Sequence, residues 1–209
     1  MHKRSTTSGS FCVRAGFTLL ELLIVLMIFT VVTALFIANY RRFGNNVTLS
    51  NVADEVALSI REMQTYGLAS KESVIGGDDF KQAFGMNIAA GQVSSYLLFV
   101  DKVEADRKFD SGEMVSQYRL PADITFSQRC TFNDNTETNV TNAIQDITFK
   151  RPDPDAKIYS YASASQQASA TTYSSIRMCL KSGQNSKEKT VLVSQAGQIE
   201  VLDGCLCSN

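Results

Sequence analysis

The sequence predicts an α+β protein, in which one long N-terminal helix packs on a mostly antiparallel β-sheet head. Three observations predict this. The run from Phe17 to Ala38 is apolar apart from Glu21. Apolar residues then recur every three or four positions beyond residue 50, as on one face of a helix. From residue 74 onward the apolar residues occur in short runs separated by turn-forming residues, which is typical of strands. We expect segments at residues 1–16, 17–39, 40–72 and 73–209.

The apolar run from Phe17 to Ala38 is long enough to cross a membrane. A helix rises about 1.5 Å per residue, so 22 residues span the roughly 30 Å of a hydrocarbon core. Three basic residues precede the run and Arg41 and Arg42 follow it. This difference favours a cytoplasmic N-terminus, with the head outside. We therefore expect residues 17–39 to form a single-pass membrane helix.

The start of this run does not fit an ordinary secretory signal. Such a signal has an apolar stretch of about 7–15 residues followed by a small-residue cleavage site. Here the small residues Ala15 and Gly16 precede the apolar run, and Glu21 lies inside it. An unpaired carboxylate in a bilayer is costly. If the chain is cut after Gly16, the new amine of Phe17 lies one turn from Glu21 and can neutralise it, within one subunit or between neighbours, which would set their register.

Residues Arg14-Ala15-Gly16-Phe17-Thr18-Leu19-Leu20-Glu21-Leu22-Leu23 resemble the cleavage and methylation motif of type IV prepilins. The resemblance implies that residues 1–16 are a leader, removed at the Gly16–Phe17 bond by a prepilin peptidase of the inner membrane. It also implies that Phe17 becomes N-methylated and that Glu21 guides assembly. A simple membrane anchor with a chance acid is the alternative.

The same resemblance implies partners and a location. The partners would be the prepilin peptidase, other pilin or pseudopilin subunits in a helical filament, and an inner-membrane assembly platform. The precursor would sit in the inner membrane with its head extracytoplasmic. The assembled filament would then lie in the periplasm or on the cell surface.

Composition excludes several kinds of chemistry. The chain has 209 residues, with 20 Lys and Arg against 21 Asp and Glu, one histidine and no tryptophan. Three basic residues and no acid precede residue 17, so a chain beginning at Phe17 carries a net charge of −4. With His2 in the leader, a histidine base or histidine metal ligand is missing from such a chain. We expect no enzyme activity and no cofactor.

Residues 40–72 are predicted to form an amphipathic helix. Its apolar stripe contains Val52, Val56, Ile60 and Met63. Residues 41–46 include glycine and two asparagines, which disfavour helix interiors, so we expect a bend or local melting there. The stripe could be buried under the chain's own sheet or contact another subunit. Pilin-like proteins use such a helix as the spine of the head.

The head is predicted to be one mostly antiparallel sheet. Residues 157–172 are rich in Ser, Ala and Gln and predict an exposed loop. The spine helix, the segment 96–101, an acidic loop and the segment 193–199 together resemble, more loosely, the H-type minor pseudopilins of type II secretion and related pilus systems. The expected strands are 84–88, 96–100, 115–120, 124–126, 144–149, 175–180, 190–194 and 198–202.

The loop from Asp101 to Glu113 carries five carboxylates. Oxygen ligands of this kind suit Ca²⁺, and Asp101, Asp106, Asp110 and Glu113 are weak candidates to hold it. The spacing differs from that of a ready-made calcium loop, because Val103 and Ala105 occupy the alternating positions. A solvated turn is the other interpretation.

Four cysteines fall in the C-terminal half, an even number that fits disulfides outside the cytoplasm. Three pairings are open. A Cys205–Cys207 bridge would close a small, strained ring, so we favour Cys130 and Cys179 each bonded to one of the C-terminal pair. A zinc site is the rival interpretation, although the spacing departs from the usual C-x₂₋₄-C pairs.

Three functions remain to be compared. The first is a structural subunit of a pilus, type II secretion or competence filament. The second is a filament-displayed head that captures DNA or another ligand, which would bind phosphates through basic residues and weaken with salt. The third, an anchored enzyme, lacks a catalytic constellation in the sequence. The cations that could cluster on one face for DNA are Arg119, Arg129, Lys150, Arg151, Lys181, Lys187 and Lys189.

Overall fold

The computed structural model describes residues 17–69, 82–102, 106–134, 136–183 and 187–208. The chain forms two compact units, Met1–Arg41 and Arg42–Asn209, which are described one at a time. The predicted leader, with Gly16 and Cys12, lies outside the described residues.

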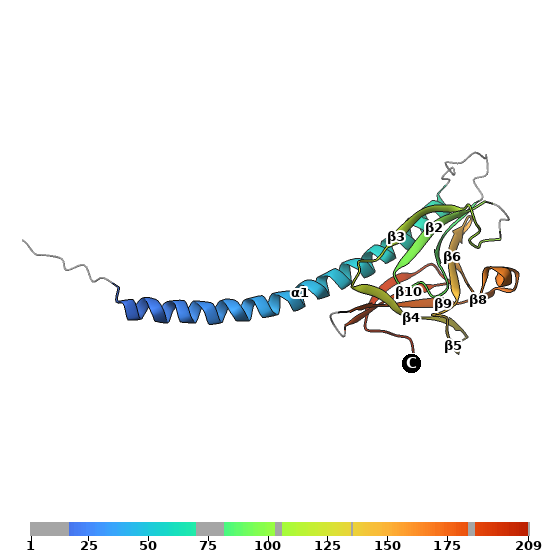
Figure 1. The fold of residues 1–209 in the computed structure, drawn as a ribbon. Coiled ribbons are helices and arrows are strands. Elements are labelled where there is room, and N and C mark those ends of the chain that lie inside the picture. The colour runs from blue at the N-terminus through green and yellow to red at the C-terminus, as the bar shows by residue number, and fades with distance from the viewer. Residues whose placement is uncertain (1–16, 70–81, 103–105, 135, 184–186, 209) are drawn as a thin grey trace, which may run out of the picture. The chain divides into compact units, whose positions relative to one another are not determined.

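A single long helix, α1 (Leu19–Leu68), belongs to both units (Figure 1). A bend or local melting was predicted at residues 41–46. These residues are helical, so the chain does not melt there. The helix ends at Leu68, whereas residues 70–72, where the sequence predicts its end, lie outside the described part.

The head contains two antiparallel sheets where one was predicted. All eight predicted strands are found, and the one predicted at 124–126 is clearly longer, extending to residue 133. One sheet has six strands in the order β3-β2-β1-β6-β7-β8, and the other has five in the order β11-β10-β9-β4-β5. The strands are β1 (Ala83–Ile88), β2 (Ser95–Asp101), β3 (Met114–Arg119), β4 (Ile124–Asn133), β5 (Thr136–Asn139), β6 (Ile144–Lys150), β7 (Asp153–Tyr161), β8 (Thr171–Tyr173), β9 (Ser175–Ser182), β10 (Glu188–Ser194) and β11 (Ile199–Asp203).

Three strands were not predicted. The exposed loop expected at 157–172 is wrong in part, because β7 and β8 occupy its ends and pair with each other. Between them lies the short 3₁₀ helix η1 (Ala164–Ser169). The alternation of β7 was missed because small residues hide it: Ala156 and Ile158 point into the core, while Lys157 and Tyr159 point outward. The third strand, β5, has only polar residues.

One hydrophobic core joins the second half of α1 to both sheets (Figure 1). The predicted helix stripe is buried, from Val52 to Met63, and the spine therefore serves the chain's own head. Its partners come from β1, β2, β6 and β7 of the larger sheet and from β4, β9, β10 and β11 of the smaller one. Burial also raises the pKa of Tyr96 to about 12, and its hydroxyl lies 3.0 Å from that of Ser59 on α1.

The last turns of α1 approach the head closely. Arg61 donates to the carbonyl of Ile199, and Gln64 donates to that of Gly197, each at 3.0 Å. A Cβ atom at Gly67 would lie 2.5 Å from the carbonyl oxygen of Phe149 in β6. The helix therefore needs glycine here, because any side chain would push the helix away from the sheet.

We predict that Gly67→Ala destabilises the head by about 1–3 kcal/mol, the usual cost of overpacking, even though alanine favours a helix by about 1 kcal/mol. Urea unfolding of the full chain in detergent would measure it. The matched control is Thr65→Ala, an exposed position on the same turn, where we expect a change within about 0.5 kcal/mol. A stabilising Gly67→Ala would contradict the close packing of helix and sheet.

Candidate functional site

The N-terminus of α1 is fixed by a side-chain cap. The backbone N–H of Glu21 donates to Oγ1 of Thr18 at 3.2 Å, and that of Leu22 donates to the Thr18 carbonyl at the same distance. Thr18 is thus the N-cap, and Thr18-Leu19-Leu20-Glu21 has the T-x-x-E spacing of a capping box. The sequence contains this capping signal, but the prediction assigned roles only to Gly16, Phe17 and Glu21. The cap fixes Glu21 in the first turn, where the helix dipole favours an acid.

The first half of α1 presents an apolar surface that no described residue of its own unit covers. Leu19–Ile37 has a mean hydropathy of 2.8 and none of it is buried, so by length and composition this helix could cross a membrane. Thr30 and Thr33 donate their hydroxyls to backbone carbonyls one turn earlier. Phe17 is 81% exposed just before the cap. An apolar rod with its polar groups satisfied internally suits a bilayer or a bundle of similar helices.

Residues 13–37 match the family of the prokaryotic N-terminal methylation motif. The chain has a prepilin-like N-terminus. The matched segment includes Phe17, Thr18 and Glu21, so the capped helix start described above is the part of the chain that the family shares. No curated protein and no solved structure matches the prepilin-like chain.

The described part of the acidic loop is solvated at its turn but not at its two ends. Ser111 and Gly112 are exposed, whereas Asp101 and Glu113 are each only 1% exposed, so the solvated-turn interpretation is wrong for these two carboxylates. Glu113 accepts hydrogen bonds from the backbone N–H groups of Lys102 and Asp110, and Asp101 accepts one from Arg107. Inward-facing carboxylates therefore hold the described part of the loop, because each one satisfies donors that the turn would otherwise leave unpaired.

The four calcium candidates have different roles. Asp106 pairs with Lys108 at 2.9 Å, and its other oxygen accepts from the backbone of the same lysine. Asp110 is half-buried. Among the described residues, no group of three carboxylates has its oxygen atoms close enough together to share an ion. Three of the four carboxylates, those of Asp101, Asp106 and Glu113, thus bind the loop's own backbone.

This loop covers the outer face of the larger sheet. Phe109 packs edge-on against Phe99 of β2, with 5.5 Å between ring centroids. The backbone N–H of Phe109 donates to Asp146, a fully buried acid on β6. Asp146 also accepts from Tyr161 at 2.5 Å and from Asn87 at 2.6 Å. Burial raises the pKa of Asp146 to about 6, against the opposing effect of these hydrogen bonds.

The four cysteines form two bridges, Cys130–Cys207 and Cys179–Cys205. Each joins the C-terminal tail to a strand of the smaller sheet, β4 for Cys130 and β9 for Cys179. The tail crosses the outer face of this sheet: Thr190 of β10 donates to Gly204, Arg177 of β9 to Leu206, and Ser208 to Glu137 of β5. With the four sulfurs in bridges, they are not free to hold zinc.

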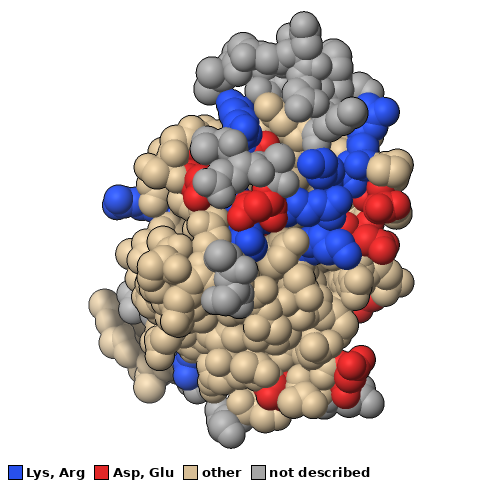
Figure 2. Space-filling model, turned by 90° about the vertical axis from the view of Figure 1, so that its right-hand side faces the viewer, with Lys and Arg blue, Asp and Glu red and all other residues tan. Residues whose placement is uncertain are grey.

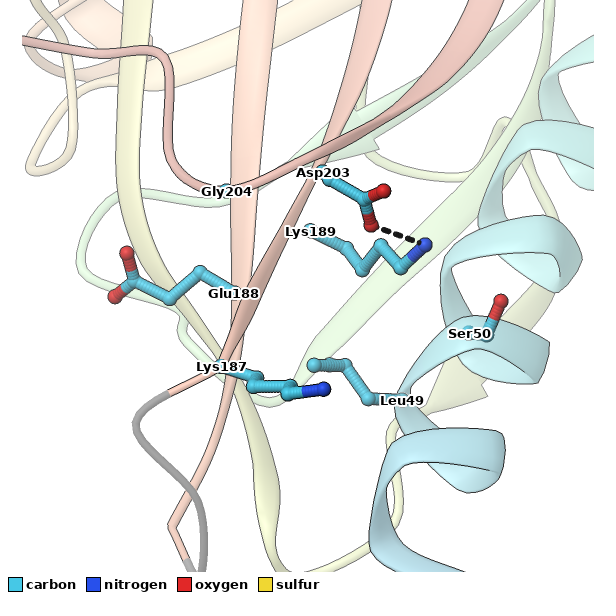
Figure 3. Close-up of a pocket in the computed structure, with 7 residues that line it drawn as sticks. All are labelled: Leu49, Ser50, Lys187, Glu188, Lys189, Asp203 and Gly204. Atoms are coloured by element: carbon cyan, nitrogen blue, oxygen red, sulfur yellow. Dashed lines mark ion pairs between the residues drawn. The ribbon is translucent and has the colours of Figure 1, made fainter. Parts of the chain in front are cut away.

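A hollow of about 510 Å³ lies between α1 and strands β10 and β11 (Figure 3). The ion pair between Lys189 and Asp203, at 2.7 Å, spans its side. Leu49 supplies the apolar wall, and Lys187 and Glu188 add one charge of each sign. Charges in this hollow balance, and the residues that line it include no nucleophile beside a base. The chain's one histidine lies outside the described residues.

Three of the basic residues considered for DNA are buried or paired with acids. Arg129 is only 1% exposed, its Nη2 donates to the carbonyl of Thr141, and desolvation lowers its pKa to about 10. Lys181 pairs with Glu188, and Lys189 pairs with Asp203. Figure 2 shows Lys and Arg side chains gathered on one face with Asp and Glu beside them. This mixture of signs weakens the attraction for a phosphate backbone.

We predict that burial of Asp146 makes the head more stable in mild acid. The pKa of Asp146 is about 6 in the folded chain and near 3.9 in the unfolded chain. Its contribution to the stability of the fold is therefore complete below pH 4 and is lost as the pH rises through 6. The loss corresponds to roughly 3 kcal/mol. Asp101, whose pKa burial also raises, contributes in the same direction.

The measurement is urea unfolding of the full chain between pH 4 and 7, for the wild type and two variants. Asp146→Asn should lose most of the decrease in unfolding free energy with rising pH. It should also be less stable at every pH, since its amide cannot accept from all three donors. Asp153→Asn, at an exposed position, should keep the pH dependence of the wild type. Parallel profiles for the wild type and Asp146→Asn would refute the assignment.

Proposed function

We propose that this prepilin-like chain is a structural subunit, a pseudopilin or minor pilin, of a type IV pilus, type II secretion or competence filament. One observation carries the proposal: the methylation motif leads directly into a capped helix whose 19-residue apolar span is covered by no described residue of its own unit. An apolar surface of this length is unfavourable in water, so a helix that ended its folding in water would not leave it uncovered. Parallel packing of several such helices would cover it.

Glu21 would set the register of this packing. Cleavage after Gly16 leaves a positive amine on Phe17, one turn before the carboxylate. If the amine of one subunit meets Glu21 of its neighbour, the two are staggered by four residues, or roughly 6 Å. A buried charge pair specifies register well, because misaligned helices leave two unpaired charges in an apolar core.

The proposed route follows from these parts. The precursor waits in the inner membrane with its head outside, the prepilin peptidase frees Phe17, and an assembly platform adds the subunit to a helical filament. The looser resemblance to H-type minor pseudopilins supports a minor subunit. The head then acts by contact with neighbouring subunits and not by catalysis.

The first test is the mass and N-terminal sequence of the chain isolated from membranes of cells with and without a prepilin peptidase. We expect a chain that begins at N-methylated Phe17 only where the peptidase is present. A chain that keeps residues 1–16 in both cells, or that is cut beyond the apolar run, would remove the basis of the proposal.

The second test separates charge from helix capping. Glu21→Gln removes the carboxylate but keeps the backbone N–H that Thr18 caps, so we expect normal cleavage and a drop of at least about tenfold in the sheared filament fraction. Thr18→Val removes the cap and keeps the charge, at a cost of about 1 kcal/mol, so assembly should persist. Equal assembly of Glu21→Gln and wild type would rule out the register role.

A further inference from the structure

The strap formed by residues 204–208 brings three sulfur atoms together. The Sγ atoms of Cys179, Cys205 and Cys207 all lie within 4.8 Å of one another, although Cys207 is bonded elsewhere, to Cys130. Cys130 shares its own group only with Cys207 and Glu137 among the described residues. Cys179 therefore has two tail sulfurs within reach and Cys130 has one.

The unfolded chain has almost no means to choose between these two sulfurs. Cys205 is 26 residues from Cys179, and Cys207 is only two residues further along the chain. Because loop closure depends weakly on length, the two bridges would form in a ratio of about 1.1. The correct register depends instead on folded contacts, in which Thr190, Arg177 and Glu137 bind residues 204–208.

The tail sulfurs are also the accessible ones. Cys130 and Cys179 are buried, whereas Cys205 and Cys207 are half-buried. Both tail cysteines line a hollow of about 440 Å³ with Ser127, Gln128, Lys181 and Glu188. An external thiolate that enters this hollow meets the tail sulfur of each bridge, and the departing sulfur is the strand cysteine.

We propose that the Cys205-Leu206-Cys207 segment is a thiol–disulfide exchange site, at which an extracytoplasmic dithiol isomerase corrects the register of the tail. The partner class rests on the extracytoplasmic head of the proposed function, but the exchange chemistry does not. The substrate is the isomer that pairs Cys179 with Cys207 and Cys130 with Cys205.

The exchange balances without net oxidation. The isomerase thiolate bonds to Cys207 and releases the Cys179 thiolate. That thiolate attacks Cys205, forms the final Cys179–Cys205 bridge and releases the Cys130 thiolate. Cys130 then bonds to Cys207 and returns the isomerase thiolate, so two bridges are present before and after.

The test uses two full-length variants in detergent, each of which also carries Cys12→Ser, so that each keeps one native bridge and has one free thiol. In Cys130→Ser the free Cys207 thiolate can attack Cys179, forming a Cys179–Cys207 bond and expelling Cys205. At pH 8 the free thiol should divide between Cys205 and Cys207 within about tenfold, a ratio equivalent to about 1.4 kcal/mol. Alkylation and peptide mapping report the division.

Cys179→Ser is the matched control. Here Cys205 is free and could attack either sulfur of the Cys130–Cys207 bridge. Cys130 is out of its reach, since the group of sulfurs and acids around Cys130 and Cys207 does not include Cys205, and attack on Cys207 would close the small, strained Cys205–Cys207 ring. All alkylation should therefore fall on Cys205. Labelling confined to Cys207 in Cys130→Ser, or spread over both tail cysteines in Cys179→Ser, would overturn the proposal.

The Cys12→Ser chain, which keeps all four cysteines of the head, gives a second, independent measurement. Reduced chain oxidised in urea by ferricyanide should yield both register isomers in similar amounts, since the unfolded chain does not distinguish them. After removal of urea, a glutathione redox buffer should convert the mixture to the native pairs. A single isomer after oxidation in urea, or a mixture that glutathione leaves unchanged, would contradict the proposed exchange site. Neither result depends on cleavage or filament assembly, so failure here leaves the proposed function standing.

Discussion

The head depends on one constraint: each of its two sheets has two faces, and α1 can help to bury only the face of each sheet that points into the shared core. The helix stripe from Val52 to Met63 supplies the shared core between α1 and both sheets. The outer faces need covers of their own. The loop 101–113 covers the larger sheet through Phe109, and the C-terminal strap crosses the smaller one. Both covers are short segments with little apolar area, so each depends on polar or covalent bonds to stay in place.

These two covers solve the same problem by different chemistry. The loop turns Asp101 and Glu113 inward to accept backbone hydrogen bonds, and Asp146 reaches it from the sheet below. Burying acids costs free energy, and the raised pKa of Asp146 is the measure of that cost. The strap instead uses two disulfides, with Arg177 stacked on Phe132 and bonded to the carbonyl of Leu206. Disulfides constrain the unfolded chain and so need no apolar area.

The sequence could predict those features that neighbouring residues in the chain determine, and not those that depend on contacts between distant segments. The helix stripe and eight of the strands have clear periodicity, and the motif around Phe17 is read residue by residue. The inward direction of Asp101 and Glu113 could not be predicted, because an acid that binds backbone donors and an acid in water look alike in sequence. Strand β7 was missed because Ala156 fills a core position without an apolar signal strong enough to mark it. The burial of Arg129 follows a bulge in β4 between Phe126 and Gln128, which shifts the facing of later residues.

The same helix serves two purposes that place opposite demands on its surface. Under the proposed function, its apolar side chains up to Ile37 must remain uncovered until other helices reach them, whereas from Leu49 onward they are buried within the chain's own head. Thr18 and Glu21 would serve the first purpose, since the cap would fix the acid where a neighbour's amine meets it. The head must therefore be stable without any help from the apolar span. Its covered outer faces and paired cysteines give it that independence, and they leave the first half of α1 free for assembly.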